Sequence, residues 1–194
     1  MKIRLLENTC LSLFSSITIV MILSQGFLPI QAQEITNKKP SPDLVKQIIA
    51  KISKDYSDIN SDDKFPFSFA EIDLNSDKQK ETIVLFKRGR LCNNRHCPVS
   101  IFNNDKNKQS SNLISEIFTS RHGLEIAVLP TKSYGWYDIA AYVFTYEPRD
   151  ETWRVFRFNG QEYELTEKKL NSKPKNILLN EYSREFNLSD FQNK

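Results

Sequence analysis

The sequence contains few of the residues on which many metal sites and enzymes depend. Among 194 residues there are five glycines, three cysteines and two histidines. So few glycines, together with eight prolines, exclude a collagen-like or low-complexity chain. Two histidines provide few ligands for a zinc site. Thirteen phenylalanines and seven tyrosines instead predict a folded chain with one hydrophobic core.

Sequence motifs of several large enzyme classes are also absent. The chain has no G-x-S-x-G nucleophile elbow, no H-E-x-x-H zinc motif, no P-loop and no dinucleotide-binding glycine pattern. Its net charge of +3 is nearly balanced, so the charge does not require a nucleic acid or an acidic membrane as partner. These features favour a non-enzymatic function, and we expect no nucleic-acid binding.

The first 32 residues have the layout of a secretory signal peptide. Lys2 and Arg4 give a positive start, residues 11–23 form an apolar core, and Ala32 precedes a cleavage site. We therefore expect a secreted or periplasmic chain that begins at Gln33 and does not contact the membrane after cleavage. The alternative is an uncleaved N-terminal anchor, because about 20 uncharged residues can span a bilayer.

Cleavage at this site would remove Cys10 and leave two cysteines, Cys92 and Cys97. An even pair in an exported chain predicts a disulfide bond, and the polar Asn-Asn-Arg-His segment between them can form a hairpin loop. The alternative is a zinc site that adds His96 and His122. Zinc sites, however, favour two-residue knuckles and further cysteine or histidine pairs.

The mature chain begins with a polar lead-in, residues 33–40, followed by one strong helix signal. Ser41 is a predicted N-cap, Pro42 takes the first helical position, and the helix is expected to end near Ser57. Apolar residues recur three or four positions apart along it, at Leu44, Val45, Ile48, Ile49, Ile52 and Tyr56. This spacing predicts an amphipathic helix that packs on another part of the fold.

Short β-rich segments follow the helix as far as residue 165. They are residues 65–74, 81–87, 99–102, 113–118, 124–129, 137–146, 152–158 and 162–165. Asn159 and Gly160, between the last two, are a strong hairpin signal. No helical pattern separates the segments, so they predict an α+β fold in which the N-terminal amphipathic helix packs on a mostly antiparallel sheet of about seven or eight short strands.

The expected organisation is a single α+β domain over residues 41–165. From residue 166 the sequence becomes polar and rich in lysine. We therefore expect residues 166–194 to form a polar, partly ordered C-terminal tail, in which residues 177–179 and 182–188 could dock on the domain.

Residues 73–81, Asp-Leu-Asn-Ser-Asp-Lys-Gln-Lys-Glu, carry the clearest metal chemistry in the chain. Oxygen-bearing side chains occur at the first, third, fifth and ninth positions, which lets a tight loop surround a hard cation. The candidate calcium ligands are the side chains of Asp73, Asn75, Asp77 and Glu81 and the main-chain carbonyl of Gln79. The alternative is an Asx-rich turn, in which the same side chains bind backbone amides.

This segment resembles the calcium loops of FG-GAP and related repeats, where D-x-[DN]-x-D-G-x-x-[DE] joins two strands, except that Lys78 replaces the glycine. A longer resemblance covers about residues 67–165. The order E-I-D-L-N-x-D-x-x-x-E-x-I-V-L, C-x-x-x-x-C-P-V-S-I-F, Y-G-W-Y-D-I and F-R-F-N-G-Q-E-Y is similar to a family of small exported bacterial proteins without a characterised activity. The resemblance implies a fold and a compartment only.

Three aromatic residues around Gly135 form a candidate binding platform: Tyr134, Trp136 and Tyr137. Exposed rings could stack on sugars or peptides, and the alternative is that they close the edge of the core. We therefore expect an exported, non-enzymatic binding or structural module of the cell envelope that calcium could stabilise. Its partner would be an envelope or extracellular protein or glycan. The binding surface would be either this platform or one edge that carries both residues 73–81 and residues 92–97.

Two enzymatic alternatives use the few catalytic side chains that the chain offers. An exported hydrolase could use Glu71 and Asp73, which alternate on the same face of a predicted strand. A triad would need His122, Asp138 and a serine, and the sequence does not single out any serine. Inhibition of an extracellular hydrolase is a further, non-enzymatic alternative.

Overall fold

The protein is represented by a computed structural model that describes residues 38–55, 64–104, 113–146 and 149–192. The predicted signal peptide and Tyr56 lie outside the described residues. Within the described part of the chain, no helix is both long and apolar enough to cross a membrane.

Antiparallel strands dominate the described residues. The elements in order are α1 (Pro42–Asp55), β1 (Pro66–Ile72), β2 (Glu81–Phe86), β3 (His96–Phe102), β4 (Leu113–Ser120), β5 (Ile126–Ser133), β6 (Trp136–Tyr146), β7 (Arg149–Phe158), β8 (Tyr163–Lys169), β9 (Ile177–Leu179), β10 (Phe186–Asn187) and α2 (Ser189–Gln192). Sheet A has the strand order β10-β1-β2-β3-β4, and sheet B has the order β8-β7-β6-β5-β9. Every described strand pair is antiparallel. The mostly antiparallel character and the few helices are as predicted, whereas the single sheet of seven or eight strands is corrected to two sheets of five.

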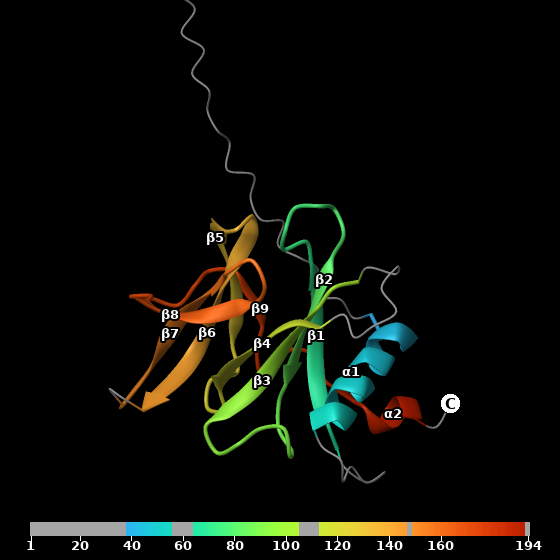
Figure 1. Cartoon of the computed structure of the whole chain (residues 1–194). Helices are drawn as coiled ribbons and strands as arrows, with labels where there is room; N and C mark the ends of the chain where they lie inside the picture. The colour runs from blue at the N-terminus through green and yellow to red at the C-terminus, as the bar shows by residue number, and fades with distance from the viewer. Residues whose placement is uncertain (1–37, 56–63, 105–112, 147–148, 193–194) are drawn as a thin grey trace, which may run out of the picture.

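The helix and the two sheets form three layers. On β2, Ile83 and Leu85 belong to the core between the sheets, whereas Val84 and Phe86 belong to the core that includes α1. This division follows from the alternation of side chains along a strand. Figure 1 shows α1 on the side of sheet A that faces away from sheet B. Sheet A is therefore buried on both faces, which explains why all six residues of β2 are buried.

The first helix forms as the sequence predicts. The Ser41 hydroxyl accepts the backbone N–H of Leu44 at 3.1 Å, which is the geometry of an N-cap. The helix ends at Asp55. Its buried apolar face packs against the outer face of sheet A, where Phe67 and Phe69 lie in the same core cluster. The predicted members of this face that are buried are Leu44, Val45, Ile48 and Ile52.

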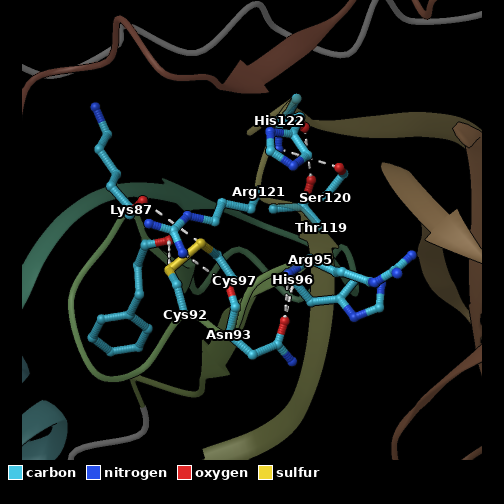
Figure 2. Close-up of a disulfide and its surroundings, with 12 residues drawn as sticks. Lys87, Cys92, Asn93, Arg95, His96, Cys97, Thr119, Ser120, Arg121 and His122 are labelled. Atoms are coloured by element: carbon cyan, nitrogen blue, oxygen red, sulfur yellow. Dashed lines mark hydrogen bonds between the residues drawn. A yellow bond between two sulfur atoms is a disulfide. The ribbon is translucent and has the colours of Figure 1, made fainter.

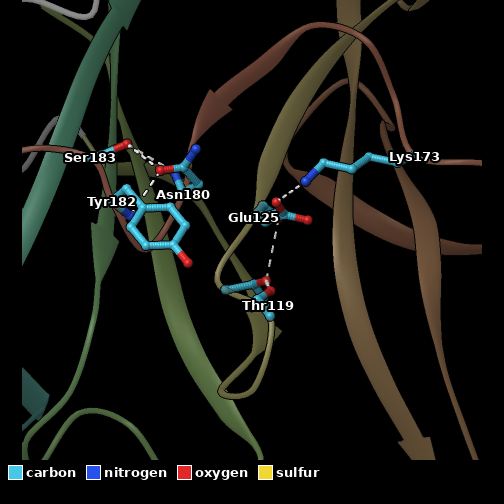
Figure 3. A network of polar contacts seen from close by, with 7 residues as sticks. Thr119, Glu125, Lys173, Asn180, Tyr182 and Ser183 are labelled. Carbon is cyan, nitrogen blue, oxygen red and sulfur yellow. Dashed lines mark hydrogen bonds and ion pairs between the residues drawn. The ribbon is translucent and has the colours of Figure 1, made fainter.

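The residues expected to form a C-terminal tail contribute strands to both sheets. β9 pairs with β5, and β10 pairs with β1. The Lys87 ammonium donates to the carbonyl oxygens of Glu181 and Ser183, at 2.7 and 2.5 Å. Lys173, which precedes β9, forms an ion pair with Glu125, which precedes β5 (Figure 3). These contacts hold residues 166–192 on the domain.

Candidate functional site

Two of the predicted site regions lie together at one end of the sheets. The acidic loop, residues 73–81, joins β1 to β2, and the aromatic turn, residues 133–136, joins β5 to β6. We call this end of the molecule the loop end. The backbone N–H of Tyr137 donates to the carbonyl oxygen of Leu74 at 2.8 Å. The fold therefore connects the candidate metal loop directly to the candidate aromatic platform.

Lys132 makes a second connection between these two regions. Its ammonium lies 2.5 Å from the Ser76 hydroxyl and 4.1 Å from the centroid of the Tyr137 ring. The aromatic ring attracts this cation, which also limits its movement. Sequence reasoning missed Lys132, because no local pattern marks a lysine that reaches across from another sheet.

The acidic loop is organised by hydrogen bonds from its own amides. Asp73 accepts the N–H groups of Asp77 and Lys78 at 3.2 and 3.0 Å. Asn75 Oδ1 accepts the N–H of Asp77 at 2.9 Å, and Asp77 Oδ1 accepts that of Gln79 at 2.7 Å. Lys78 has a φ of 72°, the left-handed geometry that a glycine adopts easily. The Asx-rich turn therefore accounts for these contacts.

Glu81 points in a different direction from the rest of the acidic loop. It is the first residue of β2, and side-chain alternation puts it on the same face as Ile83 and Leu85, between the two sheets. The residue is only 1% exposed. Its Oε2 accepts the N–H of Leu74 at 2.7 Å, whereas Oε1 has no hydrogen-bond partner among the described residues. Glu81 therefore places an unsatisfied carboxylate oxygen beneath the acidic loop.

The surroundings of Glu81 disfavour its charged form. Burial is the main cause, and the nearby carboxylates of Asp77 and Asp73 act in the same direction. Backbone hydrogen bonds from Leu74 and from the N–H of Glu81 itself offset only part of this effect. Together these contributions raise the pKa of Glu81 from 4.5 to about 7.

The acidic loop does not contain a complete set of carboxylate ligands in this conformation. Among the described residues, no group of three or more His, Cys, Asp or Glu side chains is placed to hold a metal ion. A calcium ion takes six to eight oxygens and accepts amide and carbonyl oxygens as well as carboxylates. An ion at this loop would therefore also need the Asn75 side chain and the Gln79 carbonyl, in addition to Asp73, Asp77 and Glu81.

Of the three rings in the predicted aromatic platform, one is well exposed. Trp136 stacks on Phe158 with a centroid distance of 4.7 Å, and both Trp136 and Tyr137 pack against the core between the sheets. These two residues fit the core-edge interpretation. Tyr134 is 77% exposed and has a φ of 50°, a conformation that is unusual for a bulky residue. It is therefore the member of the platform that can stack on a ligand.

The structure does not bring together the residues of the two catalytic alternatives, the triad and the hydrolase carboxylates. Asp138 is buried and accepts the hydroxyls of Thr131 and Ser133 at 2.6 and 2.7 Å. Its ion-pair partner is Arg157, with Nε at 3.6 Å, so none of these partners is a histidine. Glu71, the first of the two predicted hydrolase carboxylates, pairs with Lys38 at 3.4 Å. The second, the Asp73 carboxylate, binds loop amides.

The predicted disulfide between Cys92 and Cys97 is confirmed, with Cα atoms 4.2 Å apart. Figure 2 shows the bond beneath the turn formed by residues 92–97, where Asn93 Oδ1 accepts the N–H groups of Arg95 and His96 at 2.8 and 2.6 Å. Sulfur atoms that are bonded to each other are not zinc ligands, so the zinc alternative is excluded for this pair.

The disulfide and the acidic loop lie at opposite ends of β2. The acidic loop precedes Glu81, whereas the pairing of Leu85 with Val99 places Cys97 near the other end of the strand. The edge that was expected to carry both regions is therefore not formed. Of the two expected surfaces, the aromatic platform is the one that the fold joins to the acidic loop.

Reduction of the disulfide is expected to lower the free energy of unfolding by about 2 kcal/mol, because the closed loop is short. Urea unfolding with and without a reductant measures the change. The Cys92→Ser, Cys97→Ser double variant is the matched control, since its stability should be equally low under both conditions. A wild-type curve that does not respond to the reductant would show that the bond is missing from the exported chain.

Comparisons of the chain with known protein families, with curated protein sequences and with solved structures found no match. The chemistry of the loop end is therefore the basis for assigning a function. That chemistry combines one exposed aromatic ring, Tyr134, with several polar side chains of the acidic loop and one buried, unsatisfied carboxylate, Glu81.

Proposed function

We propose that the mature chain is an exported, non-enzymatic binding module whose partner is an envelope or extracellular protein or glycan. Two features support export: the signal-peptide layout of the first 32 residues and the Cys92–Cys97 pair, which suits an oxidising compartment. The proposed contact surface is the loop end.

The contact between the acidic loop and the aromatic turn is the observation that carries this proposal. Lys132 contacts both Ser76 and the Tyr137 ring, and the Tyr137 N–H donates to the Leu74 carbonyl oxygen, so these contacts join the two regions. The left-handed backbone of Tyr134 is strained, and strain of this kind is concentrated at functional sites. Tyr134 follows Lys132 by two residues, and the carboxylates and amides of the loop that Lys132 contacts offer hydrogen bonds to a ligand. Such a surface can bind by stacking and by polar contacts at the same time.

We further propose that calcium stabilises the loop end. The supporting observation is Glu81 Oε1, which is buried beneath the loop without a hydrogen-bond partner among the described residues. A buried carboxylate oxygen without a hydrogen-bond partner is costly, and a cation held between Glu81 Oε1 and the loop oxygens would reduce this cost. Calcium binding would also hold the loop in place beside Tyr134.

The hydrolase alternative has no comparable support. A hydrolytic site would need carboxylates that converge on a cavity. Glu71 instead pairs with Lys38, and Asp73 accepts two loop amides. Inhibition of an extracellular hydrolase is one form that binding to a protein partner could take.

Replacing Tyr134 by alanine is expected to abolish most binding of envelope material without unfolding the chain, because the ring is exposed. Immobilised chain can be incubated with a solubilised envelope fraction, and the retained protein and glycan measured. Tyr182→Ala is the matched control, since Tyr182 is 85% exposed and lies between β9 and β10. Retention lost only in Tyr134→Ala supports the proposal. Equal retention by the wild type and both variants would contradict it.

A further inference from the structure

A cavity of about 290 Å³ lies beside the last turns of α1, and none of its lining residues belongs to the loop end. Side chains from α1 and from strands β3 and β4 contribute to its walls, together with two residues of the segment before β3. Its charged lining residues include Lys51, Asp55 and Glu116, and Pro98 and Phe118 are among the apolar ones. The cavity is slightly smaller than the usual range for drug-sized ligands, so it suits a small molecule or a single side chain.

Among the Lys, Asp and Glu side chains that line the cavity, negative charge exceeds positive charge, and the other titratable lining residue is His96, whose Nε2 lies 2.8 Å from the carbonyl oxygen of Phe144. The Lys51 ammonium lies 2.8 Å from Asp55 Oδ2 and 2.5 Å from Glu116 Oε2. Although burial lowers the pKa of Lys51, its hydrogen bonds and charge interactions with these two carboxylates outweigh that effect and raise it. The ammonium therefore stays charged, and two carboxylates surround one cation.

The carboxylates of Asp55 and Glu116 are accessible to a ligand, whereas the ammonium of Lys51 is not. The Lys51 side chain is 5% exposed, but those of Asp55 and Glu116 are 43% and 42% exposed. An incoming anion would meet these two carboxylates before it reached Lys51. An incoming cation would meet two carboxylates, and Lys51 neutralises only one of their two negative charges.

The remaining walls of the cavity suit an aliphatic chain. Leu91 and Pro98 supply apolar surface, and Pro98 lies on the same face of sheet A as Glu116, because Pro98 pairs with Phe118, two residues along β4 from Glu116. We propose that this cavity binds a primary ammonium group carried on an aliphatic stem, with Asp55 and Glu116 as its acceptors. The source could be a free diamine or a lysine side chain. The proposal does not depend on the loop end.

Binding can be measured by NMR titration of the exported, isotope-labelled chain with two probes of similar length and opposite charge. Cadaverine carries two ammonium groups, and glutarate carries two carboxylates. We expect cadaverine to shift the amide signals of residues around Glu116 and glutarate not to do so. Stronger binding of glutarate, or no binding of either probe, would overturn the proposal.

Variants of the two acceptors test the site itself. Glu116→Gln is expected to weaken cadaverine binding by up to about fivefold, which is the effect of removing one partly exposed charge partner. Glu185→Gln is the matched control, because Glu185 pairs with Arg88 outside the cavity. Asp55→Asn provides a second variant if Glu116→Gln does not fold. Equal affinity in the wild type and in a folded acceptor variant would overturn the proposal.

A third probe separates the two sources of the ammonium group. N-acetyl-lysine amide presents the same group as the side chain of a peptide. Affinity equal to that of cadaverine supports a lysine side chain as the ligand, and binding of cadaverine alone supports a free diamine. Failure of Tyr134→Ala to affect envelope binding would leave this result unchanged, since none of the lining residues belongs to the loop end.

Discussion

Rising pH is expected to destabilise the wild-type chain by up to about 3 kcal/mol relative to the Glu81→Gln variant, because burial raises the pKa of Glu81 from 4.5 to about 7. The folded state then binds the Glu81 proton more tightly than the unfolded state does. The stabilisation from this proton is complete below pH 4.5 and is lost as the pH rises through about 7. Glutamine has a similar shape, and its carbonyl oxygen can still accept the N–H of Leu74.

Urea unfolding of both chains across this pH range, with a chelator present to exclude calcium, measures the effect. The Glu71→Gln variant is the matched control, because Glu71 is partly exposed and pairs with Lys38 on the surface. Its stability should follow that of the wild type at every pH, apart from a small constant difference. A difference between wild type and Glu81→Gln that does not change with pH would show that Glu81 titrates normally.

Phe67→Ala is expected to lower the free energy of unfolding by about 3–5 kcal/mol, which corresponds to a fall in melting temperature of roughly 10 °C or more. Phe67 is fully buried on the outer face of sheet A, in the core that α1 completes, and its ring lies 5.9 Å from that of Phe186. Alanine would leave a cavity between the helix, β1 and β10.

Calorimetry or circular dichroism of the folded variants measures this loss. Tyr182→Ala provides the comparison, because a tyrosine that is 85% exposed should contribute little to the core. A loss below about 1 kcal/mol for Phe67→Ala would contradict the packing of α1 on sheet A.

Local sequence signals were sufficient to predict the first helix and most of the strands. The Ser41 cap and the three- and four-residue spacing of Leu44, Ile48 and Ile52 depend only on neighbouring residues, and α1 follows them closely. The Asn159-Gly160 hairpin forms for the same reason, with Gly160 at a φ of 103°.

The division into two sheets could not be derived in this way. Residues 83–86, IVLF, are apolar without alternation, which is typical of a strand covered on both faces but does not identify the covering elements. The short strands β9 and β10 form through pairing with β5 and β1, and Lys87 holds the segment between them from a distance in sequence. The sequence identified residues 177–179 and 182–188 as segments that could dock, but the strands with which they pair depend on long-range contacts that the sequence does not identify.

The candidate site was predicted in its parts but not in its arrangement. Sequence spacing identified the residues of the acidic loop and of the aromatic turn. The inward direction of Glu81 could have been inferred from its alternation with Ile83 and Leu85. Tyr134 and Gly135 lie between the paired residues Ser133 and Trp136, so their left-handed backbone, with φ of 50° and 82°, belongs to a local hairpin turn, whereas the reach of Lys132 depends on tertiary packing.

The sequence also contains a weak signal for the cavity beside α1. Lys51 and Asp55 continue the spacing of Leu44 and Ile48, with steps of three or four residues, so they lie along the same side of the helix, where Lys51 is buried and Asp55, in the last turn, is exposed. A lysine at such a position indicates a buried partner, but the sequence does not identify that partner as Glu116 on β4.

Thermal unfolding of residues 33–194 at neutral pH, with excess calcium and with chelator, is the most direct test of the proposal that the loop end is a calcium-stabilised binding surface. A ligand at about 100 times its dissociation constant adds about 2.7 kcal/mol to the stability. We predict a rise in melting temperature of several degrees with calcium in the wild type and in Glu162→Ala, an exposed acidic control outside the loop, and no rise in Asp77→Ala. Identical melting curves for the wild type with calcium and with chelator would contradict the account.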